Sequence, residues 1–195
     1  MNTLSPQEYP LLDLVQVYKK ALTKEQCSFV IKKTDEFHWL PHQWSGYNKL
    51  SEAPKSEENC DRTELFGMTR LLISGFVKNA IDEYKKYVIK TLGTNFNING
   101  ITIPEINRYR EGKGMAEHVD HITSIFDGTR KGIPTLSIVG LLNDDFDGGE
   151  FKFWDKYDMN LEIGDILVFP SNFLYKHQVD KVTKGTRYSF VSWIY

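Results

Sequence analysis

A histidine and an aspartate stand two positions apart near the middle of the chain, at His118 and Asp120. In a β-strand, residues i and i+2 project from the same face, so this imidazole and this carboxylate would point to one side together. A nitrogen and an oxygen donor on one face are two suitable ligands for a divalent metal ion. The pair therefore predicts part of a metal site, and a third ligand is expected from elsewhere in the chain.

The third ligand is expected to be a histidine, because iron oxygenases bind their metal through two histidines and one carboxylate on one face of an octahedron. The other positions then stay open for a cosubstrate and dioxygen. The candidates are His38, His42 and His177, and His177 lies in the half of the chain where strands are expected. His121 would face away from Asp120 and is expected to be an ordinary surface or packing residue.

An arginine follows His177 by ten residues, in the alternating run 186–193. The alternation places Arg187 and Ser189 on one face of a strand. A planar guanidinium beside a hydroxyl is a bidentate receptor for a carboxylate, and an arginine buried without a partner is heavily penalised. The joint pattern predicts a metal site with a carboxylate-binding pocket beside it.

These side chains fall in the second half of the chain, where the hydrophobic pattern has a period of two. Short runs separated by turn signals such as Asp127-Gly128 and Lys184-Gly185 indicate a β-sandwich or a jelly roll. The expected strands are residues 101–110, 115–121, 135–142, 149–154, 159–163, 166–169, 174–178 and 186–195.

The first half of the chain predicts two amphipathic helices that support a sheet. A capping box from Thr23 to Gln26 opens the first, with apolar positions at Cys27, Val30, Ile31 and Phe37. The second ends near Gly93. Its expected apolar stripe comprises Leu65, Met68, Leu72, Phe76, Ala80, Tyr84 and Val88.

Two polar segments lie between the expected elements, residues 39–62 and 122–134. Both are long for simple connections, and loops beside a scaffold often determine specificity. We expect them to cover the metal site, where His38 or His42 could contact a substrate. Those two histidines have the spacing of helical zinc ligands, but Pro41 interrupts any helix between them.

The composition is that of one ordinary globular domain, since the chain has 195 residues and is 41% hydrophobic and 26% charged. A net charge of −2 gives no general attraction to nucleic acid or anionic membrane. The two cysteines cannot form a disulfide framework, residues 1–10 do not resemble a secretory signal, and no apolar run is long enough to span a bilayer. A soluble cytoplasmic protein is therefore expected, with neither nucleic acid nor membrane as a partner.

Residues 100–195 resemble the 2-oxoglutarate- and Fe(II)-dependent oxygenases, specifically the prolyl 4-hydroxylase-like branch. The resemblance is carried by the ligand and arginine motifs above and by residues 141–151, which look like the family's hairpin with its Gly-Gly-Glu turn. It implies iron binding by His118, Asp120 and His177, and binding of the 2-oxoglutarate C5 carboxylate by Arg187. Tyr109, in a Tyr-x-x-Gly context, is expected to donate a hydrogen bond to the cosubstrate.

One position departs from the pattern of the family. Some relatives have a tyrosine on the strand before Asn143-Asp144, where this chain has Leu141. The second donor to the cosubstrate carboxylate is therefore expected to be Ser189 or Tyr109.

The resemblance implies a mainly β fold, with a double-stranded β-helix (jelly roll) core buttressed by two N-terminal helices. We expect a single domain over residues 1–195, with helical support and a loop in 1–99 and the core in 100–195. The implied activity is that of a dioxygenase that hydroxylates an unactivated C–H bond of a prolyl residue in a peptide or protein, releasing succinate and CO2. Its cofactors would be Fe(II), 2-oxoglutarate and O2, with ascorbate as a candidate reductant.

Two other functions remain open from the sequence. The enzyme could hydroxylate a free amino acid or another small metabolite, or the domain could be a non-catalytic jelly-roll module that binds a ligand through its metal. Residues 143–148 also imitate the start of an EF-hand loop. The twelfth position of that loop is Trp154 rather than glutamate, so a hairpin turn is expected there instead.

Overall fold

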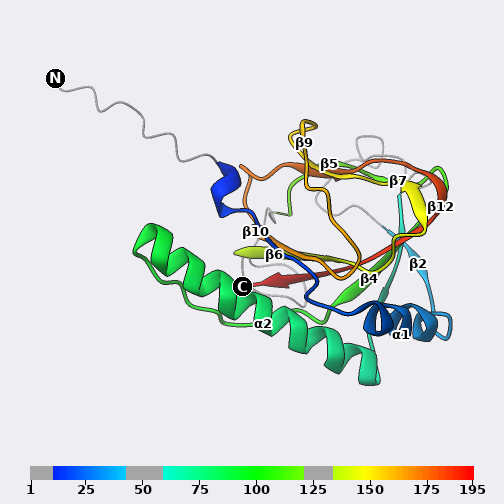
Figure 1. The fold of residues 1–195 in the computed structure, drawn as a ribbon, viewed down its shortest axis with the longest axis horizontal. Helices are drawn as coiled ribbons and strands as arrows, with labels where there is room; N and C mark the ends of the chain where they lie inside the picture. Colours follow the sequence, from blue (N-terminus) through cyan, green and yellow to red (C-terminus); the bar gives the residue numbers. More distant parts are fainter. Residues whose placement is uncertain (1–10, 43–58, 121–133) are drawn as a thin grey trace, which may run out of the picture.

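Two antiparallel β-sheets face each other, and two helices cover the outer face of the larger sheet (Figure 1). This computed structural model describes residues 11–42, 59–120 and 134–195. Most of the two segments expected to cover the metal site lie outside these ranges, and so does His121.

The larger sheet has the strand order β1-β10-β6-β12-β4-β3-β2, with β7 paired to β12. Its strands are β1 (Gln16–Tyr18), β2 (Leu40–Pro41), β3 (Asp61–Glu64), β4 (Glu105–Arg110), β6 (Leu136–Leu141), β7 (Phe146–Gly148), β10 (Ile166–Pro170) and β12 (Val182–Ile194). The smaller sheet has the order β5-β11-β8-β9, formed by β5 (Met115–His118), β8 (Phe151–Phe153), β9 (Tyr157–Asp158) and β11 (His177–Val179).

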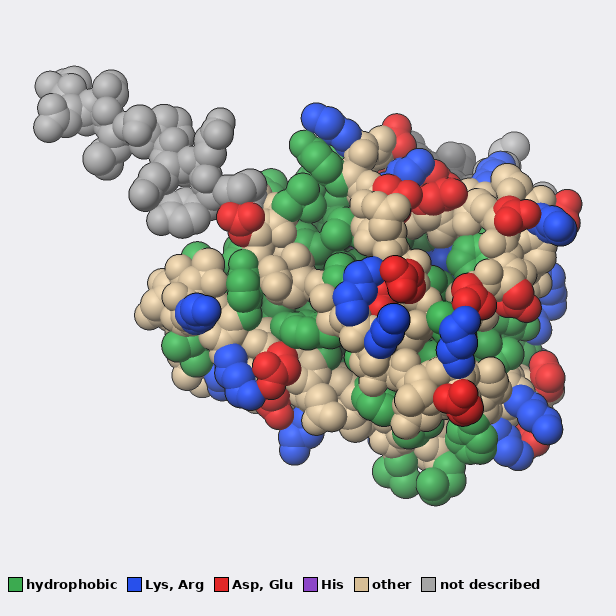
Figure 2. Space-filling model, viewed as in Figure 1, with side chains coloured by type: hydrophobic (Ala, Val, Ile, Leu, Met, Phe, Trp, Pro, Cys, Tyr) green, Lys and Arg blue, Asp and Glu red, His purple; other side chains and the backbone are tan. Residues whose placement is uncertain are grey.

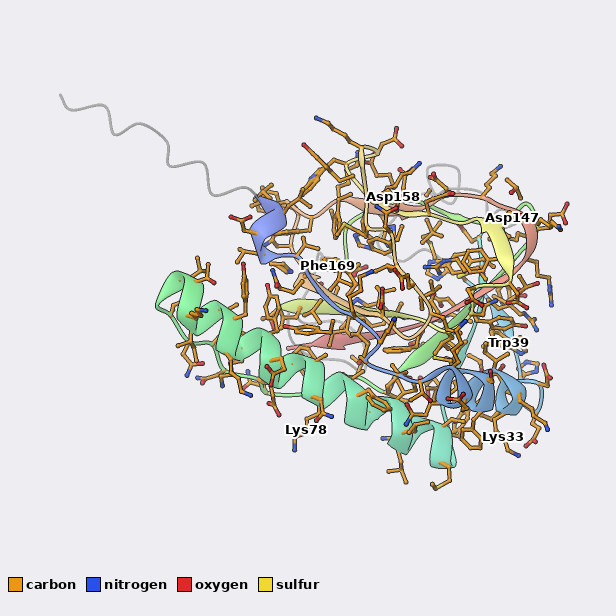
Figure 3. The ribbon with its side chains drawn as sticks, viewed as in Figure 1. Lys33, Trp39, Lys78, Asp147, Asp158 and Phe169 are labelled. Carbon is orange, nitrogen blue, oxygen red and sulfur yellow. The ribbon has the colours of Figure 1, made fainter. Side chains whose placement is uncertain are left out.

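Alternation along the strands divides the core into two layers. Along β10, Ile166 and Val168 pack in the layer beneath the helices, while Leu167 and Phe169 pack between the two sheets. Figure 3 shows Phe169 in this inner layer. The inner layer is the one that receives the predicted site residues.

Helix α1 (Lys24–Thr34) begins at the predicted capping box. The Thr23 side chain accepts a hydrogen bond from the Gln26 backbone N–H, and the Gln26 side chain accepts one from the Thr23 backbone N–H. Cys27 and Val30 are buried as expected. Phe37 lies beyond the end of the helix, and the 3₁₀ turn η1 (Leu11–Leu14) precedes β1 near the start of the described chain.

Helix α2 (Gly67–Leu92) ends at Gly93, which adopts φ 64°, as the sequence predicts. Its predicted buried stripe is partly wrong. The buried row is Thr69, Ile73, Val77, Ala80, Ile81, Tyr84 and Val88. Met68 is 69% exposed, and Leu65 is buried but precedes the helix. Two neighbouring rows of this helix are apolar, so packing against the sheet decides which of them is buried.

Several strand boundaries differ from those expected. The run 159–163 is not a strand, because Asn160 adopts φ 44° and its N–H bonds the Asp158 side chain in a tight turn. The expected strand 174–178 begins only at His177, after a turn at Asn172. Strand β4 begins at Glu105, just after Pro104, and the first half of the chain adds β1 to β3 to the larger sheet.

The Gly-Gly-Glu segment is not a hairpin turn, contrary to the expectation. Strand β8 continues in the direction of β7 without a reversal of the chain. Strand β7 pairs with β12 through Gly148 and Val182, and β8 pairs with β11 through Phe151 and Val179. Between them the Gly149 N–H donates to the Lys181 carbonyl. Positive φ angles at Gly148 and Gly149 allow the chain to kink here and pass from one sheet to the other.

The surface carries acidic and basic side chains interspersed on the face shown in Figure 2. An apolar cluster at the lower end of this view lies over the start of α2, where Phe66, Met68 and Leu71 are exposed. Cys27 and Cys60 are both free and buried. None of the described helices combines the length and hydropathy needed to cross a bilayer.

Candidate metal and cosubstrate site

Two histidines from distant parts of the sequence are direct neighbours across the smaller sheet. His118 ends β5 and His177 begins β11, and the two residues are paired in the register of these antiparallel strands. Their ring centroids lie 4.3 Å apart. The strand pairing therefore selects His177 from the three histidines that the sequence left as candidates for the third ligand.

Asp120 completes a three-residue cluster just beyond the end of β5. Its Oδ1 lies 3.5 Å from His118 Nε2, and its Oδ2 lies 3.8 Å from His177 Nε2. One donor atom from each of the three side chains lies within 4.8 Å of the others. Among the described residues, His38 and His42 do not belong to this cluster.

The orientation of both imidazoles is set by their own backbone. His118 Nδ1 lies 2.8 Å from the Ala116 carbonyl, and His177 Nδ1 lies 3.0 Å from the Tyr175 carbonyl. A carbonyl oxygen can only accept, so each Nδ1 carries the proton. Each Nε2 then keeps a lone pair that faces Asp120, as a metal-ligating histidine requires.

Burial and mutual charge act on these three groups in different directions. Burial alone would raise the pKa of Asp120, but the neighbouring His177 and His118 and the hydrogen bond from Ser137 hold it well below its usual range. Burial lowers the pKa of His177 to about 4, which Asp120 only partly offsets. Burial would also lower the pKa of His118, but the adjacent Asp120 carboxylate and the Ala116 carbonyl raise it overall. A carboxylate beside a neutral His177 is the protonation state suited to a cation.

Apolar rings surround the histidine from the inner layer. Phe151 stacks on the His177 ring with centroids 5.2 Å apart, and Phe169 approaches it edge-on at 5.0 Å. Phe153 is 5.9 Å away. These rings hold the imidazole in place and keep water away from it on one side.

Ser137 is a site residue that the sequence patterns did not single out. Its hydroxyl donates to Asp120 Oδ2 over 2.6 Å and lies 2.8 Å from the Ser171 hydroxyl. A signal was present in the sequence, because Ser137 is the one hydrogen-bonding side chain in the buried strand β6, Leu136–Leu141.

The predicted carboxylate receptor is buried in the same inner layer. Arg187 is 1% exposed, and its Nη1 donates to the Ser189 hydroxyl over 2.8 Å. Its guanidinium carbon lies 5.2 Å from the ring centroid of Tyr109, the residue paired with it on β4. Within the part of the chain that the structure describes, no carboxylate lies within ion-pair distance of Arg187.

The tyrosine of this pocket keeps its proton. Burial raises the pKa of Tyr109 well above its usual range, so the phenol is available as a hydrogen-bond donor. Asn107 donates to its oxygen over 3.4 Å. Leu141 is paired with Ser189 on the neighbouring strand, which places an apolar side chain where some relatives are expected to have a second donor.

His42 also lies near the metal cluster, although it is not part of it. Its backbone N–H donates to the Cys60 carbonyl next to β3. Burial and the nearby charges of Arg62 and His118 lower the pKa of His42 to about 4. The position is compatible with the expected substrate contact.

Residues 104–195 match the family model of the 2OG-Fe(II) oxygenase superfamily. The matched residues include the whole His-Asp-His cluster and Arg187. The family uses Fe(II), 2-oxoglutarate and O2, and the cluster of two imidazoles and one carboxylate next to a buried arginine fits both the metal and the dicarboxylate.

The chain resembles a PKHD-type hydroxylase of Idiomarina loihiensis, with 39% identity over 93 residues that cover 46% of this chain and 40% of the relative. The chain spans about two fifths of the length of the first curated relatives that it matches.

Solved structures resemble the chain over most of its length. The viral collagen prolyl hydroxylase of Paramecium bursaria Chlorella virus-1, in its 2OG complex, has a TM-score of 0.67 at 14% identity and covers 93% of this chain and 94% of its own. A Trichoplax adhaerens prolyl hydroxylase, bound to a hypoxia-inducible-factor peptide fragment, has a TM-score of 0.68 at 16% identity and covers 94% and 84%. At such identities the likeness shows the fold, and it confirms the predicted jelly-roll core.

Proposed function

We propose that this protein is an Fe(II)- and 2-oxoglutarate-dependent hydroxylase with His118, Asp120 and His177 as its iron ligands. One observation carries the proposal: a His-Asp-His cluster and a buried arginine without a carboxylate partner among the described residues share one inner layer. A jelly roll that only filled its core would need neither feature. Both are explained by a metal and a dicarboxylate bound together.

The cosubstrate is held at its far end by Arg187. The guanidinium and the Ser189 hydroxyl that contacts it bind the C5 carboxylate. Tyr109 keeps its proton and donates a hydrogen bond to the cosubstrate. The protein supplies orientation here: Ser189 directs the guanidinium, and the Tyr109 ring supports it from the neighbouring strand.

When bound, Fe(II) would supply the oxidising chemistry: 2-oxoglutarate and O2 would be converted to succinate and CO2, with one oxygen atom of O2 in the succinate and the other in a hydroxyl group on the substrate. His118, Asp120 and His177 would hold the metal with three protein donors, a set that is compatible with further reactants on the same ion. Phe151, Phe153 and Phe169 exclude water behind His177.

The proposed substrate is a prolyl residue in a peptide or protein. Support comes from the fold shared with prolyl hydroxylases, one of which is bound to a peptide fragment, and from the PKHD-type hydroxylases among the relatives. Arg62 and His42 lie on the same side of the larger sheet as the site, where an extended peptide could contact them.

The decisive experiment is a succinate assay on the purified protein with Fe(II), 2-oxoglutarate, ascorbate and O2, combined with mass spectrometry of a proline-containing peptide library. We expect succinate release together with the gain of one oxygen atom on a peptide. An oxygenated amino acid or metabolite in place of a peptide would identify a small-molecule hydroxylase. Metal binding without succinate from any substrate tested would contradict the enzymatic proposal and favour a binding module.

A further inference from the structure

We propose that Ser137 and Ser171 form a two-hydroxyl relay that positions the Asp120 carboxylate for metal binding. Ser137 touches the carboxylate, and Ser171 acts through Ser137. The inference rests on the proposed function in one respect, the assignment of Asp120 as a metal ligand. The contacts themselves are observed between protein side chains.

The two serines meet because of strand register. Ser137 on β6 is paired with Phe169 on β10, a residue that faces the inner layer. Ser171 follows two positions after Phe169 and therefore projects to the same side, and its N–H donates to the Thr135 carbonyl. The two hydroxyl oxygens lie 2.8 Å apart.

The direction of the hydrogen bonds follows from counting protons. The ionised carboxylate of Asp120 can only accept, so Ser137 uses its single proton on Oδ2, over 2.6 Å. The contact between the two serines must then be donated by Ser171. A hydroxyl that accepts one hydrogen bond donates a stronger one, so Ser171 strengthens the contact of Ser137 with Asp120.

Burial makes this arrangement specific. Ser137 is 1% exposed and Ser171 is 2% exposed, and their neighbours in the inner layer include Val139 and Phe169. Buried hydroxyls in an apolar layer are costly unless they are paired. Here the pairing ends on a functional carboxylate, whereas the buried pair of Ser192 on β12 and Thr102 ahead of β4 bonds only within the scaffold.

The relay distinguishes the two carboxylate oxygens of Asp120. Oδ2 accepts the hydrogen bond from Ser137, whereas Oδ1 faces His118 Nε2 and accepts from no hydroxyl among the described residues, which leaves Oδ1 as the oxygen for the metal. A carboxylate that binds through one oxygen keeps more metal positions open for 2-oxoglutarate and O2.

The same turn serves a second ligand. Residues 171–175 leave β10 with Ser171 and end at Tyr175, whose carbonyl accepts from His177 Nδ1. Asn172 closes the turn by accepting from the backbone N–H groups of Leu174 and Tyr175. One short segment thus orients Asp120 through a hydroxyl and His177 through a carbonyl.

The test is anaerobic titration of the full chain with Fe(II) against a competing chelator, for wild type, Ser137→Ala, Ser171→Ala and the double variant. Outer-shell partners typically contribute 10- to 100-fold to metal affinity, so Ser137→Ala is expected to weaken Fe(II) binding by about that factor. Ser171→Ala is expected to weaken it by less. The double variant should be no weaker than Ser137→Ala, because Ser171 acts only through Ser137.

Ser192→Ala is the matched control, because it also removes a buried serine hydroxyl. The Ser192 hydroxyl bonds to Thr102 and not to any of the three candidate ligands. It should lower the melting temperature without changing Fe(II) affinity. A second readout is the visible spectrum of the Co(II)-loaded protein, which reports coordination. The spectrum is expected to change for Ser137→Ala and to be recovered in part by Ser137→Thr, which restores a hydroxyl.

Three outcomes would overturn the relay. Ser137→Ala could match wild type in Fe(II) affinity and Co(II) spectrum, Ser192→Ala could weaken binding equally, or the effects of Ser137→Ala and Ser171→Ala could simply add. If Ser137→Ala does not fold, the test rests on Ser171→Ala. Unchanged Fe(II) affinity of Ser171→Ala would then overturn the proposal. Failure of the ligand assignment is distinguishable, since wild type itself would then bind no Fe(II). Failure of the hydroxylase activity is also distinguishable, since wild type would then bind Fe(II) but release no succinate.

Discussion

Gly149 lies directly against the side-chain stem of Arg187. A Cβ atom on Gly149 would come within 2.9 Å of the Arg187 Cδ atom and within 3.1 Å of a Val182 methyl carbon. The backbone of Gly149 also adopts φ +69°, which favours glycine. The glycine that connects β7 to β8 therefore makes room for the guanidinium that binds the cosubstrate in the proposed function.

Gly149→Ala is expected to displace Arg187 and raise the KM for 2-oxoglutarate by about tenfold, since a charged hydrogen bond contributes about 1.5–3 kcal/mol. Iron affinity should stay within a factor of about two, because the ligands are not touched. Gly164→Ala is the control for backbone strain. Its φ is +86° and its Cβ would meet the Leu22 carbonyl, so it should cost stability and leave the KM unchanged. Equal KM values for the two variants would contradict the proposal that Gly149 makes room for Arg187 in the cosubstrate pocket.

Arg187→Lys keeps the positive charge and loses the two-pronged hydrogen bonding of the guanidinium. We expect the KM for 2-oxoglutarate to rise by about 10- to 100-fold with Fe(II) affinity retained. Steady-state kinetics and anaerobic Fe(II) titration check the two halves of this expectation. An unchanged KM for 2-oxoglutarate would contradict the assignment of Arg187 to the cosubstrate site.

His118→Ala and His177→Ala are each expected to reduce succinate formation and Fe(II) affinity by more than about 100-fold, beyond the loss typical of an outer-shell partner. His38→Ala is the matched control, because His38 is an exposed histidine outside the cluster. It should bind Fe(II) like wild type. Near-normal succinate release by His177→Ala would falsify the ligand assignment.

Gly75→Ala is expected to stabilise the protein. Gly75 lies on an exposed face within α2, and a Cβ there would have no described atom within 4 Å beyond the adjoining residues and the backbone of its own helix. Alanine in a helix interior is favoured over glycine by about 1 kcal/mol, which corresponds to about 2–4 °C in melting temperature for a chain of this size. Thermal denaturation measures the shift, and a lower melting temperature would contradict it.

Both thiols are expected to resist alkylation in the folded protein. Burial raises the pKa of Cys60 to about 12 and that of Cys27 to about 11. A higher pKa means less thiolate at a given pH, so at pH 8 the reactive fraction of Cys60 is only about 10⁻⁴. Labelling by a thiol reagent should be slow from pH 7 to 9 and become complete in urea. Rapid labelling of the native protein would show that the thiols are accessible.

The local pattern of the sequence already predicts which side chains of the candidate site lie together. His118 with Asp120, and Arg187 with Ser189, are pairs at spacing two, and strand geometry alone requires each pair to share a face. Their side chains do so in the structure. The capping box at Thr23 and the helix end at Gly93 are likewise local, since each depends on a few consecutive residues.

Selection among equivalent residues depends on contacts between elements. Three histidines suited the third position in the sequence, and only the pairing of β5 with β11 sets His177 beside His118. Helix α2 carries two apolar rows, and the sheet buries the row of Ile73 rather than that of Met68. Contacts between elements also explain why the Gly-Gly-Glu segment is not the expected turn. Strand β7 pairs with β12 and strand β8 pairs with β11, so the segment connects the two sheets instead.

The sequence by itself determined which chemical groups are available and which of them share a face of one element. Tertiary structure decided which faces meet, and with them the third histidine, the hydroxyls behind Asp120 and the glycine beneath Arg187. Periodicity constrains neighbours along one strand or helix, whereas the register between strands is a property of the whole packed sheet.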